Sequence, residues 1–211
     1  MPQIKYPEFL KNHAVKKSAK KDKEFVYTHT SLGDGGKPPK IYPGSYNIIE
    51  NELDEFYNVY FDHVFTKNLP SYLTEKHLDN TGPILIDLDF RFDGITEERK
   101  YTVETIQSFL KIYFKHLLEL VDIPESNLKT YVMEKPSPNP QDEKGITKDG
   151  IHFVFPNIYI DPKIQYVARN RTIADIECKE LFKKMGAKNS IADIFDKCVI
   201  ENNNWQMYGS R

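Results

Sequence analysis

The chain has 211 residues with 29 basic and 31 acidic side chains, so its formal net charge is −2 and it is not a polycation. At about 150 residues per domain this length predicts one domain with a short appendage, and 39% hydrophobic content with 13 Phe and 13 Tyr excludes disorder throughout. No run approaches the roughly 18 apolar residues of a membrane span, and two cysteines are too few for a structural zinc site. We therefore expect an intracellular protein without zinc or a membrane segment.

The first 24 residues form a predicted basic leader, and residues 25–211 form the predicted domain. No apolar segment follows the first lysines, so a secretory signal is not indicated. The leader contains a cluster of five lysines: Lys16, Lys17, Lys20, Lys21 and Lys23. Such a cluster is either a solvated leader or an arm along nucleic-acid phosphates, because phosphate contacts depend on local charge and not on the total.

The first half of the chain shows one turn-rich segment and three regular elements. Glycines and prolines over 31–46 predict a long loop or a pair of turns. Apolar residues spaced by three and four predict a helix over 49–64. The run over 84–90 predicts a central strand, buried on both faces near its start. A second amphipathic helix is predicted after Thr102, with apolar positions over 106–121.

The second half alternates extended and helical patterns. The predicted elements are a strand over 129–134, a polar loop over 135–149, a strand over 150–156, a helix over 173–185 and a strand or hairpin over 199–207. Pro156 is expected to stop the third of these, and Gly186 to cap the helix. Because strands and helices interleave, the predicted fold class is mixed α/β (α+β).

Asp87 and Asp89 are separated by one residue within the predicted strand over 84–90. Side chains alternate along a strand, so both carboxylates point to one face, with Cα atoms about 7 Å apart. Desolvated carboxylates repel unless a cation lies between them, and Mg²⁺ and Mn²⁺ prefer oxygen ligands. A solvated strand face can carry the same pattern, but the preceding apolar run favours a metal site. The pair alone does not choose between phosphoryl transfer, sugar transfer and nuclease chemistry.

Lys148, Gly150 and His152 occupy alternate positions leading into the next predicted strand, so all three can point to one side. The Lys148 ammonium and a ring N–H of His152 can hold phosphate oxygens, and Gly150 lets a ligand approach the backbone. A lone histidine on an apolar strand is more often a core residue, and on local grounds that interpretation stays open.

Asp196 precedes the apolar residues that begin the last predicted strand or hairpin. An acidic residue at such a position is, by itself, as readily a helix cap or a turn residue as a ligand. The segment over 202–211 adds three asparagines, Trp205 and Tyr208, and it ends in Gly-Ser-Arg.

The order of these three motifs resembles the archaeo-eukaryotic primase superfamily, and most closely the primase domain of the primase-helicases of nucleocytoplasmic large DNA viruses. Members carry an Asp-hydrophobic-Asp/Glu strand and then a small-x-His strand often preceded by lysine. An aspartate before an apolar strand and an Asn-rich, aromatic hairpin complete the pattern. Residues 27–30 and 44–48 are also similar to segments of the viral subgroup, so the resemblance covers about residues 25–211.

The resemblance implies two catalytic divalent cations, Mg²⁺ or Mn²⁺, held by Asp87, Asp89 and Asp196. It implies a nucleotide-binding set made up of Lys148, Gly150, His152, Ser210 and Arg211. Many members carry serine in place of Gly150, and some carry arginine in place of Gln206, so this chain lacks the contacts that those two side chains make.

The function implied by the resemblance is template-directed nucleotidyl transfer for viral DNA replication. A 3′-hydroxyl attacks the α-phosphate of a nucleoside triphosphate and pyrophosphate leaves. The implied fold is a catalytic core with an RRM-like sheet, and the implied partners are a DNA template, nucleoside triphosphates and a helicase domain downstream in the same polypeptide. Two other functions stay open: a two-metal nuclease, and an inactive module that binds nucleic acid or docks a helicase. A nuclease would explain the aspartate pair but would give Lys148 and His152 no triphosphate to bind.

Overall fold

The computed structural model describes residues 5–15, 26–33, 43–77, 81–201 and 203–210. The chain divides into two compact units, which we call the terminal unit (Met1–His77 with Asn203–Arg211) and the central unit (Leu78–Asn202). Within the described ranges no helix is both long and apolar enough to cross a bilayer. The predicted boundary between leader and domain, and the five leader lysines, lie outside the described residues.

The terminal unit combines a small antiparallel sheet with two short helices. Its elements are α1 (Tyr6–Asn12), β1 (Ala14–Val15), β2 (His29–Ser31), β3 (Gly44–Tyr46), η1 (Glu50–Glu52), α2 (Leu53–Phe61), η2 (Asp62–Thr66), β4 (Leu73–Glu75) and β10 (Trp205–Gln206), and the strand order is β1-β3-β2-β4-β10. The predicted helix over 49–64 is confirmed, since η1, α2 and η2 follow one another without a gap and bury Phe56, Val59 and Tyr60. The predicted loop or pair of turns over 31–46 contains the last residue of β2 and the whole of β3, which pair antiparallel, and its residues 34–42 lie outside the described residues.

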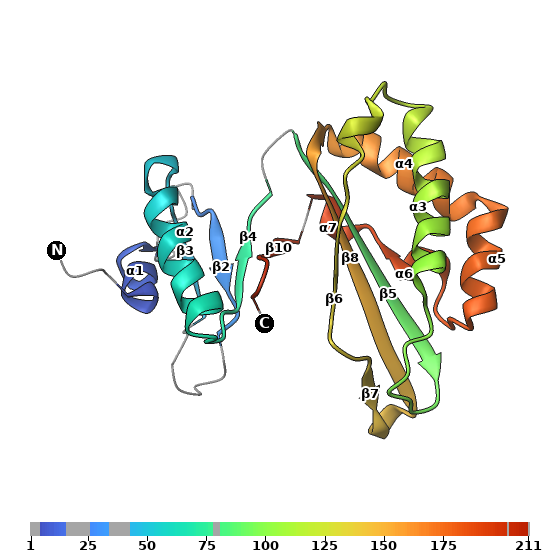
Figure 1. The fold of residues 1–211 in the computed structure, drawn as a ribbon, viewed down its shortest axis with the longest axis horizontal. Helices are drawn as coiled ribbons and strands as arrows, with labels where there is room; N and C mark the ends of the chain where they lie inside the picture. Colours follow the sequence, from blue (N-terminus) through green and yellow to red (C-terminus); the bar gives the residue numbers. More distant parts are fainter. Residues whose placement is uncertain (1–4, 16–25, 34–42, 78–80, 202, 211) are drawn as a thin grey trace, which may run out of the picture. The chain divides into compact units, whose positions relative to one another are not determined.

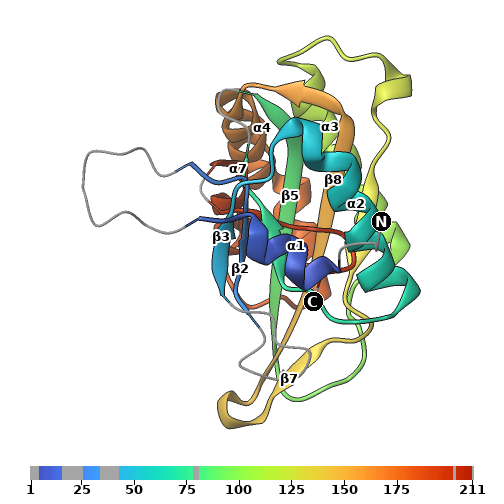
Figure 2. The same ribbon diagram turned by 90° about the vertical axis from the view of Figure 1, so that its left-hand side faces the viewer.

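The central unit is built on two long antiparallel strands that lie side by side (Figures 1 and 2). Its elements are β5 (Gly82–Asp93), α3 (Val103–Leu118), η3 (Glu125–Asn127), β6 (Tyr131–Glu134), β7 (Asn139–Gln141), η4 (Asp142–Lys144), β8 (Ile146–Ile160), α4 (Pro162–Ala174), α5 (Ile176–Met185), α6 (Ile191–Ile194), β9 (Phe195–Asp196) and α7 (Cys198–Glu201). The strand order is β6-β8-β5-β9, and β7 also pairs with β8.

One face of this sheet, which we call the apolar face, packs against α3, α4 and α5 (Figure 1). Every second residue of β5 from Ile84 to Phe92 is buried there, together with Phe153 and Phe155 of β8. Each such side chain contributes about 1.5–3 kcal/mol when fully buried. The Thr102 hydroxyl accepts a hydrogen bond from the Thr105 N–H and caps α3. The predicted central strand, the helix after Thr102 and the mixed α+β fold class are confirmed.

The predictions for β8 and the segment before it are wrong in two places. Most of the predicted loop over 135–149 is structured, because it contains β7, η4 and the start of β8. The start of β8 was not predicted because its buried positions are polar. Thr147 and Asp149 are buried and hydrogen-bonded within the protein. Pro156 does not stop β8. The pairing register shifts between Pro83 and Ile84 of β5. Pro156 therefore lies in a bulge of β8, where it does not have to donate a ladder hydrogen bond.

The two C-terminal predictions also need correction. The predicted helix over 173–185 is divided at Asp175, whose extended backbone ends α4 and whose carboxylate accepts the Glu177 N–H at the start of α5. The helix α4 was missed because most of its buried positions are polar, including Gln165 and Arg169, and give no apolar period. Among the described residues of the predicted strand or hairpin over 199–207, only those of β10 form a strand, and α7 occupies the start.

Candidate active site

The face of β5 and β8 opposite the apolar face carries charged side chains, and we call it the polar face: Asp87, Asp89, Arg91, Lys148 and His152. The two strands pair with Asp87 opposite His152, Asp89 opposite Gly150 and Arg91 opposite Lys148. Directly opposite residues of antiparallel strands point to the same side of a sheet. The structure therefore brings five of the predicted site residues together in three successive rows. They are Asp87, Asp89, Lys148, Gly150 and His152, and Arg91 is the one residue of these rows that was not predicted.

Asp87 and His152 form the closest pair of this face. The Nε2 atom of His152 lies 3.2 Å from the Oδ1 atom of Asp87, and their side chains are 35% and 15% exposed. That distance is within the range of an ion pair, but the Asp87 Oδ1 atom is buried and accepts no hydrogen bond of good geometry. A buried acceptor left in this state is costly. His152 lies on the polar face rather than in the core, which disfavours the core-histidine interpretation.

The Asp89 carboxyl has a raised pKa. Burial among the surrounding atoms is the largest cause, and the negative charges of Asp87 and Asp196 raise this pKa further. His152 and Lys135 act in the opposite direction. The charges of two neighbouring carboxylates therefore act on Asp89, and this repulsion is the property that a bound cation would relieve.

Asp196 comes from β9 and is the cross-strand partner of Asp87 on the other side of β5. Its Oδ1 atom accepts a hydrogen bond of 2.9 Å from the Cys198 N–H at the start of α7. Buried Arg169 holds the preceding backbone, because its Nε atom donates to the Phe195 carbonyl at 2.7 Å. One oxygen of Asp196 thus makes the contact expected of a turn or cap residue. The pairing of β9 with β5 places the same residue beside Asp87.

Asp87, Asp89 and Asp196 match a hard divalent cation in donor type, because all three offer carboxylate oxygens. The orphaned Asp87 oxygen and the raised pKa of Asp89 are what such a set shows when the charges are not compensated. Across the part of the chain that the structure describes, no three His, Cys, Asp or Glu side chains are gathered closely enough to form a metal cluster. The residues fit a cation in chemistry, and closure around it would require their side chains to move.

Gly150 lies close to the facing strand β5. A Cβ atom at this position would lie 3.0 Å from the Leu88 carbonyl oxygen and 3.2 Å from the Asp89 Oδ1 atom. Both distances are shorter than ordinary carbon–oxygen contacts, so a side chain here would push against the Asp89 carboxylate. Glycine at 150 therefore leaves room for that carboxylate.

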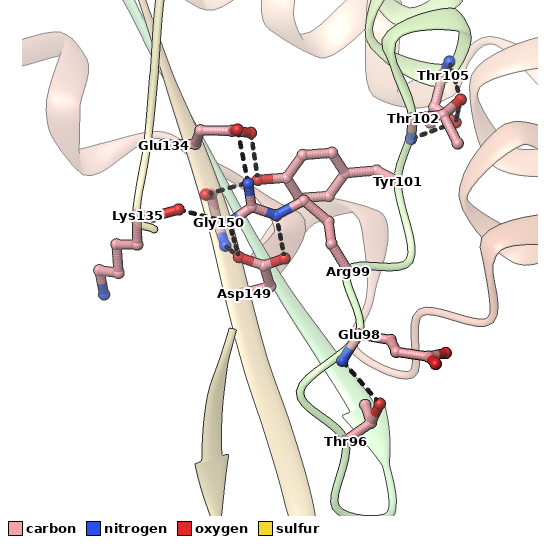
Figure 3. Close-up of polar contacts among 10 residues, drawn as sticks. All are labelled: Thr96, Glu98, Arg99, Tyr101, Thr102, Thr105, Glu134, Lys135, Asp149 and Gly150. Carbon is pink, nitrogen blue, oxygen red and sulfur yellow. Dashed lines mark hydrogen bonds and ion pairs between the residues drawn. The ribbon is translucent and has the colours of Figure 1, made fainter. Parts of the chain in front are cut away.

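A pocket of about 260 Å³ opens beside Asp89 at the end of the polar face. Lys148 lines it, together with Arg91 and Lys135. Arg99, which is not among the lining residues, joins three parts of the chain through Glu134, Lys135 and Asp149 (Figure 3). Its Nε atom lies 3.0 Å from the Asp149 Oδ2 atom, and its Nη1 atom lies 2.7 Å from a Glu134 oxygen.

Several of these residues have no local sequence pattern that would predict a role in the site. Lys135 and Arg99 lie in segments that read as polar connections, and Asp149 is a buried charge inside a strand. Asn189 also contributes, because its Nδ2 atom donates to the Asp89 carbonyl at 2.8 Å and its Oδ1 atom accepts the Arg91 N–H at 3.0 Å. It thereby continues the edge of β5 where β9 stops pairing. Such side-chain-to-backbone contacts join residues about a hundred positions apart and leave no local pattern.

The remaining predicted nucleotide-binding residues are Ser210 and Arg211. Ser210 belongs to the terminal unit, where it is 8% exposed and its carbonyl accepts a hydrogen bond from Gln206. Arg211 lies outside the described residues, as do the leader lysines. Their proposed contacts with nucleotide or nucleic acid stay predictions.

The sequence that forms the polar face matches a known protein family. The sequence model of the family described as "C962R protein N-terminal AEP domain", where AEP stands for archaeo-eukaryotic primase, matches residues 28–211. This range contains every residue of the polar face.

Two curated relatives come from large DNA viruses. "Putative helicase L207/L206" of Acanthamoeba polyphaga mimivirus is 30% identical over 210 residues, which cover 95% of this chain and 22% of that protein. "Putative helicase 184R" of Invertebrate iridescent virus 6 is 26% identical over 203 residues, covering 87% of this chain and 20% of that protein. The chain thus spans about a fifth of the length of the relatives it matches.

Proposed function

The chain belongs to the family of C962R N-terminal archaeo-eukaryotic primase domains, and from that membership we propose that its polar face is the nucleotidyl-transfer site of a viral primase. The relatives are named as helicases, so we further propose that this activity works with a helicase during DNA replication. A DNA template and nucleoside triphosphates are the substrates of the proposed reaction.

The observation that supports this proposal most strongly is the row formed by Asp196, Asp87 and His152. The three residues come from β9, β5 and β8 and are joined by strand pairing, with Asp89 in the next row. Carboxylates from two strands therefore stand next to a histidine and, further along, to a lysine. Negative oxygen ligands beside fixed positive charge suit a substrate that carries metal ions and phosphates together.

In the proposed reaction, the 3′-oxygen of the growing strand forms a bond to the α-phosphorus of a nucleoside triphosphate. The bond from this phosphorus to the bridging oxygen of the β-phosphate breaks, and pyrophosphate leaves. Two divalent cations, Mg²⁺ or Mn²⁺, held by Asp87, Asp89 and Asp196 would activate the 3′-hydroxyl and neutralise the triphosphate.

The other residues of the face bind and orient. Lys148 supplies a positive charge for phosphate oxygens, and His152 supplies a ring nitrogen beside the carboxylates. Gly150, between them, has no side chain and so leaves room for the Asp89 carboxylate beside the substrate. Catalysis of this kind depends on positioning and charge stabilisation more than on covalent participation of the protein.

A nuclease using the same aspartates is the main rival, and one assay separates the two. The purified chain is incubated with a primed DNA template, Mg²⁺ or Mn²⁺ and nucleoside triphosphates, and the length of the labelled strand is followed. The proposal predicts template-dependent extension. Shortening of the strand would favour a nuclease, and an unchanged strand would favour a binding or docking module.

A further inference from the structure

The pocket beside Asp89 is lined by two positively charged side chains that have no role in the proposed function so far. Arg91 and Lys135 line it together with Lys148, and Asn139 and Gln141 add two carboxamides. The only carboxylates among the lining residues are those of Asp89 and Asp149. The Asp149 side chain is fully buried and paired with Arg99, so three cations face the charge of one carboxylate.

The pocket exists because the sheet edge next to β8 is interrupted. Pairing of β6 with β8 ends at Glu134 opposite Ile151, and pairing of β7 resumes at Asn139 opposite Lys148. Between these points the edge of β8 has no strand partner. Side chains instead of a strand make hydrogen bonds to the backbone of Gly150. The Asp149 Oδ1 atom accepts its N–H at 2.9 Å, and the Tyr101 hydroxyl donates to its carbonyl at 3.1 Å.

Arg99 fixes the backbone at the start of this gap (Figure 3). Its Nη2 atom donates to the Lys135 carbonyl at 2.6 Å, while the same guanidinium is paired with Asp149 and Glu134. Figure 3 shows the Lys135 side chain directed away from the guanidinium. The arginine thereby ties the end of β6 to β8 and sets where Lys135 enters the pocket.

Charge is graded along the polar face. The row of Asp196, Asp87 and His152 is followed by Asp89 with Gly150, and then by Arg91 with Lys148. Successive rows are about 7 Å apart. A triphosphate with its α-phosphate near the carboxylates would have its distal phosphates in the direction of the cations. A pocket of about 260 Å³ is also smaller than the roughly 300–1,000 Å³ of sites that enclose a whole ligand, so it suits a polyphosphate end.

We propose that Lys135 and Arg91 bind the β- and γ-phosphates of the incoming nucleoside triphosphate, and that Arg99 is a positioning residue for Lys135. This inference rests on the proposed function, because it takes the nucleoside triphosphate as substrate. It adds two binding residues and one positioning residue to the same site.

The test compares binding of a nucleoside triphosphate and of the corresponding monophosphate to the full chain, by calorimetry with Mg²⁺ present. Lys135→Gln and Arg91→Gln are each expected to weaken triphosphate binding about tenfold or more, the effect of losing a hydrogen bond to a charged group. Monophosphate binding should change less than about twofold. Lys111→Gln removes the same charge from the exposed side of α3 and serves as the matched control.

Three results would overturn the inference. Triphosphate affinity in Lys135→Gln equal to that of Lys111→Gln would show that the lysine does not bind the substrate. A flatter salt dependence of DNA binding with unchanged triphosphate affinity would assign the pocket to backbone phosphates, each worth about 0.7 in slope for a single strand. If the wild-type chain binds no triphosphate, the ligand assumed by the inference is wrong.

Failure of the inference and failure of the proposed function are distinguishable. If the wild-type chain extends primers while Lys135→Gln binds triphosphate normally, only the inference is wrong. If triphosphate binding depends on Lys135 but no extension occurs, only the catalytic proposal is wrong.

The role of Arg99 has its own readout, the ratio of triphosphate to monophosphate affinity. Arg99→Lys keeps the charge but cannot contact Asp149, Glu134 and the Lys135 carbonyl at once. A positioning role predicts that this ratio falls at least severalfold. A merely structural role would lower the unfolding temperature and leave the ratio unchanged.

Discussion

The two faces of the β5–β8 pair are made by alternate residues of the same strands, yet they obey different physical rules. On the apolar face, Ile86 and Phe153 are completely buried, and packing density fixes their positions. On the polar face, Asp87 and His152 are partly exposed, and charge decides what they contact. Stability therefore depends mainly on one face and the proposed chemistry on the other, so substitutions on adjacent residues should separate the two properties.

The largest expected effect is on stability, from Phe153→Ala. Phe153 is completely buried and its ring lies 5.9 Å from that of Phe109 on α3. Removing the ring should lower the free energy of unfolding by about 3–5 kcal/mol, as large-to-small changes in a packed core do. Urea denaturation followed by circular dichroism measures this loss.

His152→Ala is the matched control for Phe153→Ala, since the two positions are neighbours on opposite faces. It should cost less than about 1 kcal/mol of stability, because a partly exposed side chain leaves no sealed cavity. Equal losses from both substitutions would mean that the two faces do not differ as described.

The next effect is on activity, from Asp87→Asn. The amide keeps the shape of the side chain but is a poor ligand for a hard cation, so template-directed extension should fall by at least about a hundredfold, the upper end of the loss on removing an outer-shell partner. Stability should change little. Asp122→Asn, at an exposed position after α3, is the control and should retain activity. Extension by folded Asp87→Asn at the rate of the control would reject the metal assignment.

A smaller effect on both properties is expected from Gly150→Ala. The added Cβ atom would lie 3.0 Å from the Leu88 carbonyl and 3.2 Å from the Asp89 carboxylate, so about 1–3 kcal/mol of stability should be lost. Activity should fall because Asp89 is displaced. Gly82→Ala is the control in the same strand pair, since no heavy atom lies within 4 Å of its Cβ position. If both variants behave alike, close approach at Gly150 is not important.

The sequence predicted the parts of this arrangement that depend on local periodicity. Alternation in β5 placed Asp87 and Asp89 on one side, and alternation before His152 did the same for Lys148. What it could not predict was the register, which sets Asp87 opposite both His152 and Asp196 and results from the packing of the whole apolar face.

Other features were missed because polar groups took structural roles. The start of β8 contains buried Asp149, whose charge is compensated by Arg99, fifty positions earlier in the chain. In α4, buried Arg169 replaces the apolar residue that would have marked the helix. The division of the chain into two units is equally non-local, since β10 near the C-terminus pairs with β4.

The smallest expected effect is a gain in stability from Asp89→Asn. The raised pKa of Asp89 means that the folded state binds this proton more tightly than the unfolded chain, so the charged form costs stability at neutral pH. This cost disappears as the pH falls through the raised pKa towards the ordinary value of 3.8. Because the Asp89 carboxylate is only partly buried and solvent still screens its charge, the gain at pH 7 without divalent cations should be about 0.2–1 kcal/mol. It should vanish below about pH 4, and a loss of stability at pH 7 would contradict the electrostatic description.

Asp89→Asn also provides the most direct test of the central claim, that the polar face is maintained for nucleotidyl transfer. The measurement is template-directed nucleotide incorporation by this variant and by the wild-type chain, at matched concentrations of folded protein with Mg²⁺ or Mn²⁺. We predict that the variant, although at least as stable as the wild type, incorporates nucleotides about a hundredfold more slowly or not at all, because losing a ligand should cost at least as much as losing an outer-shell partner. Incorporation at the wild-type rate would show that these carboxylates do not hold the catalytic cations, and the claim would be wrong.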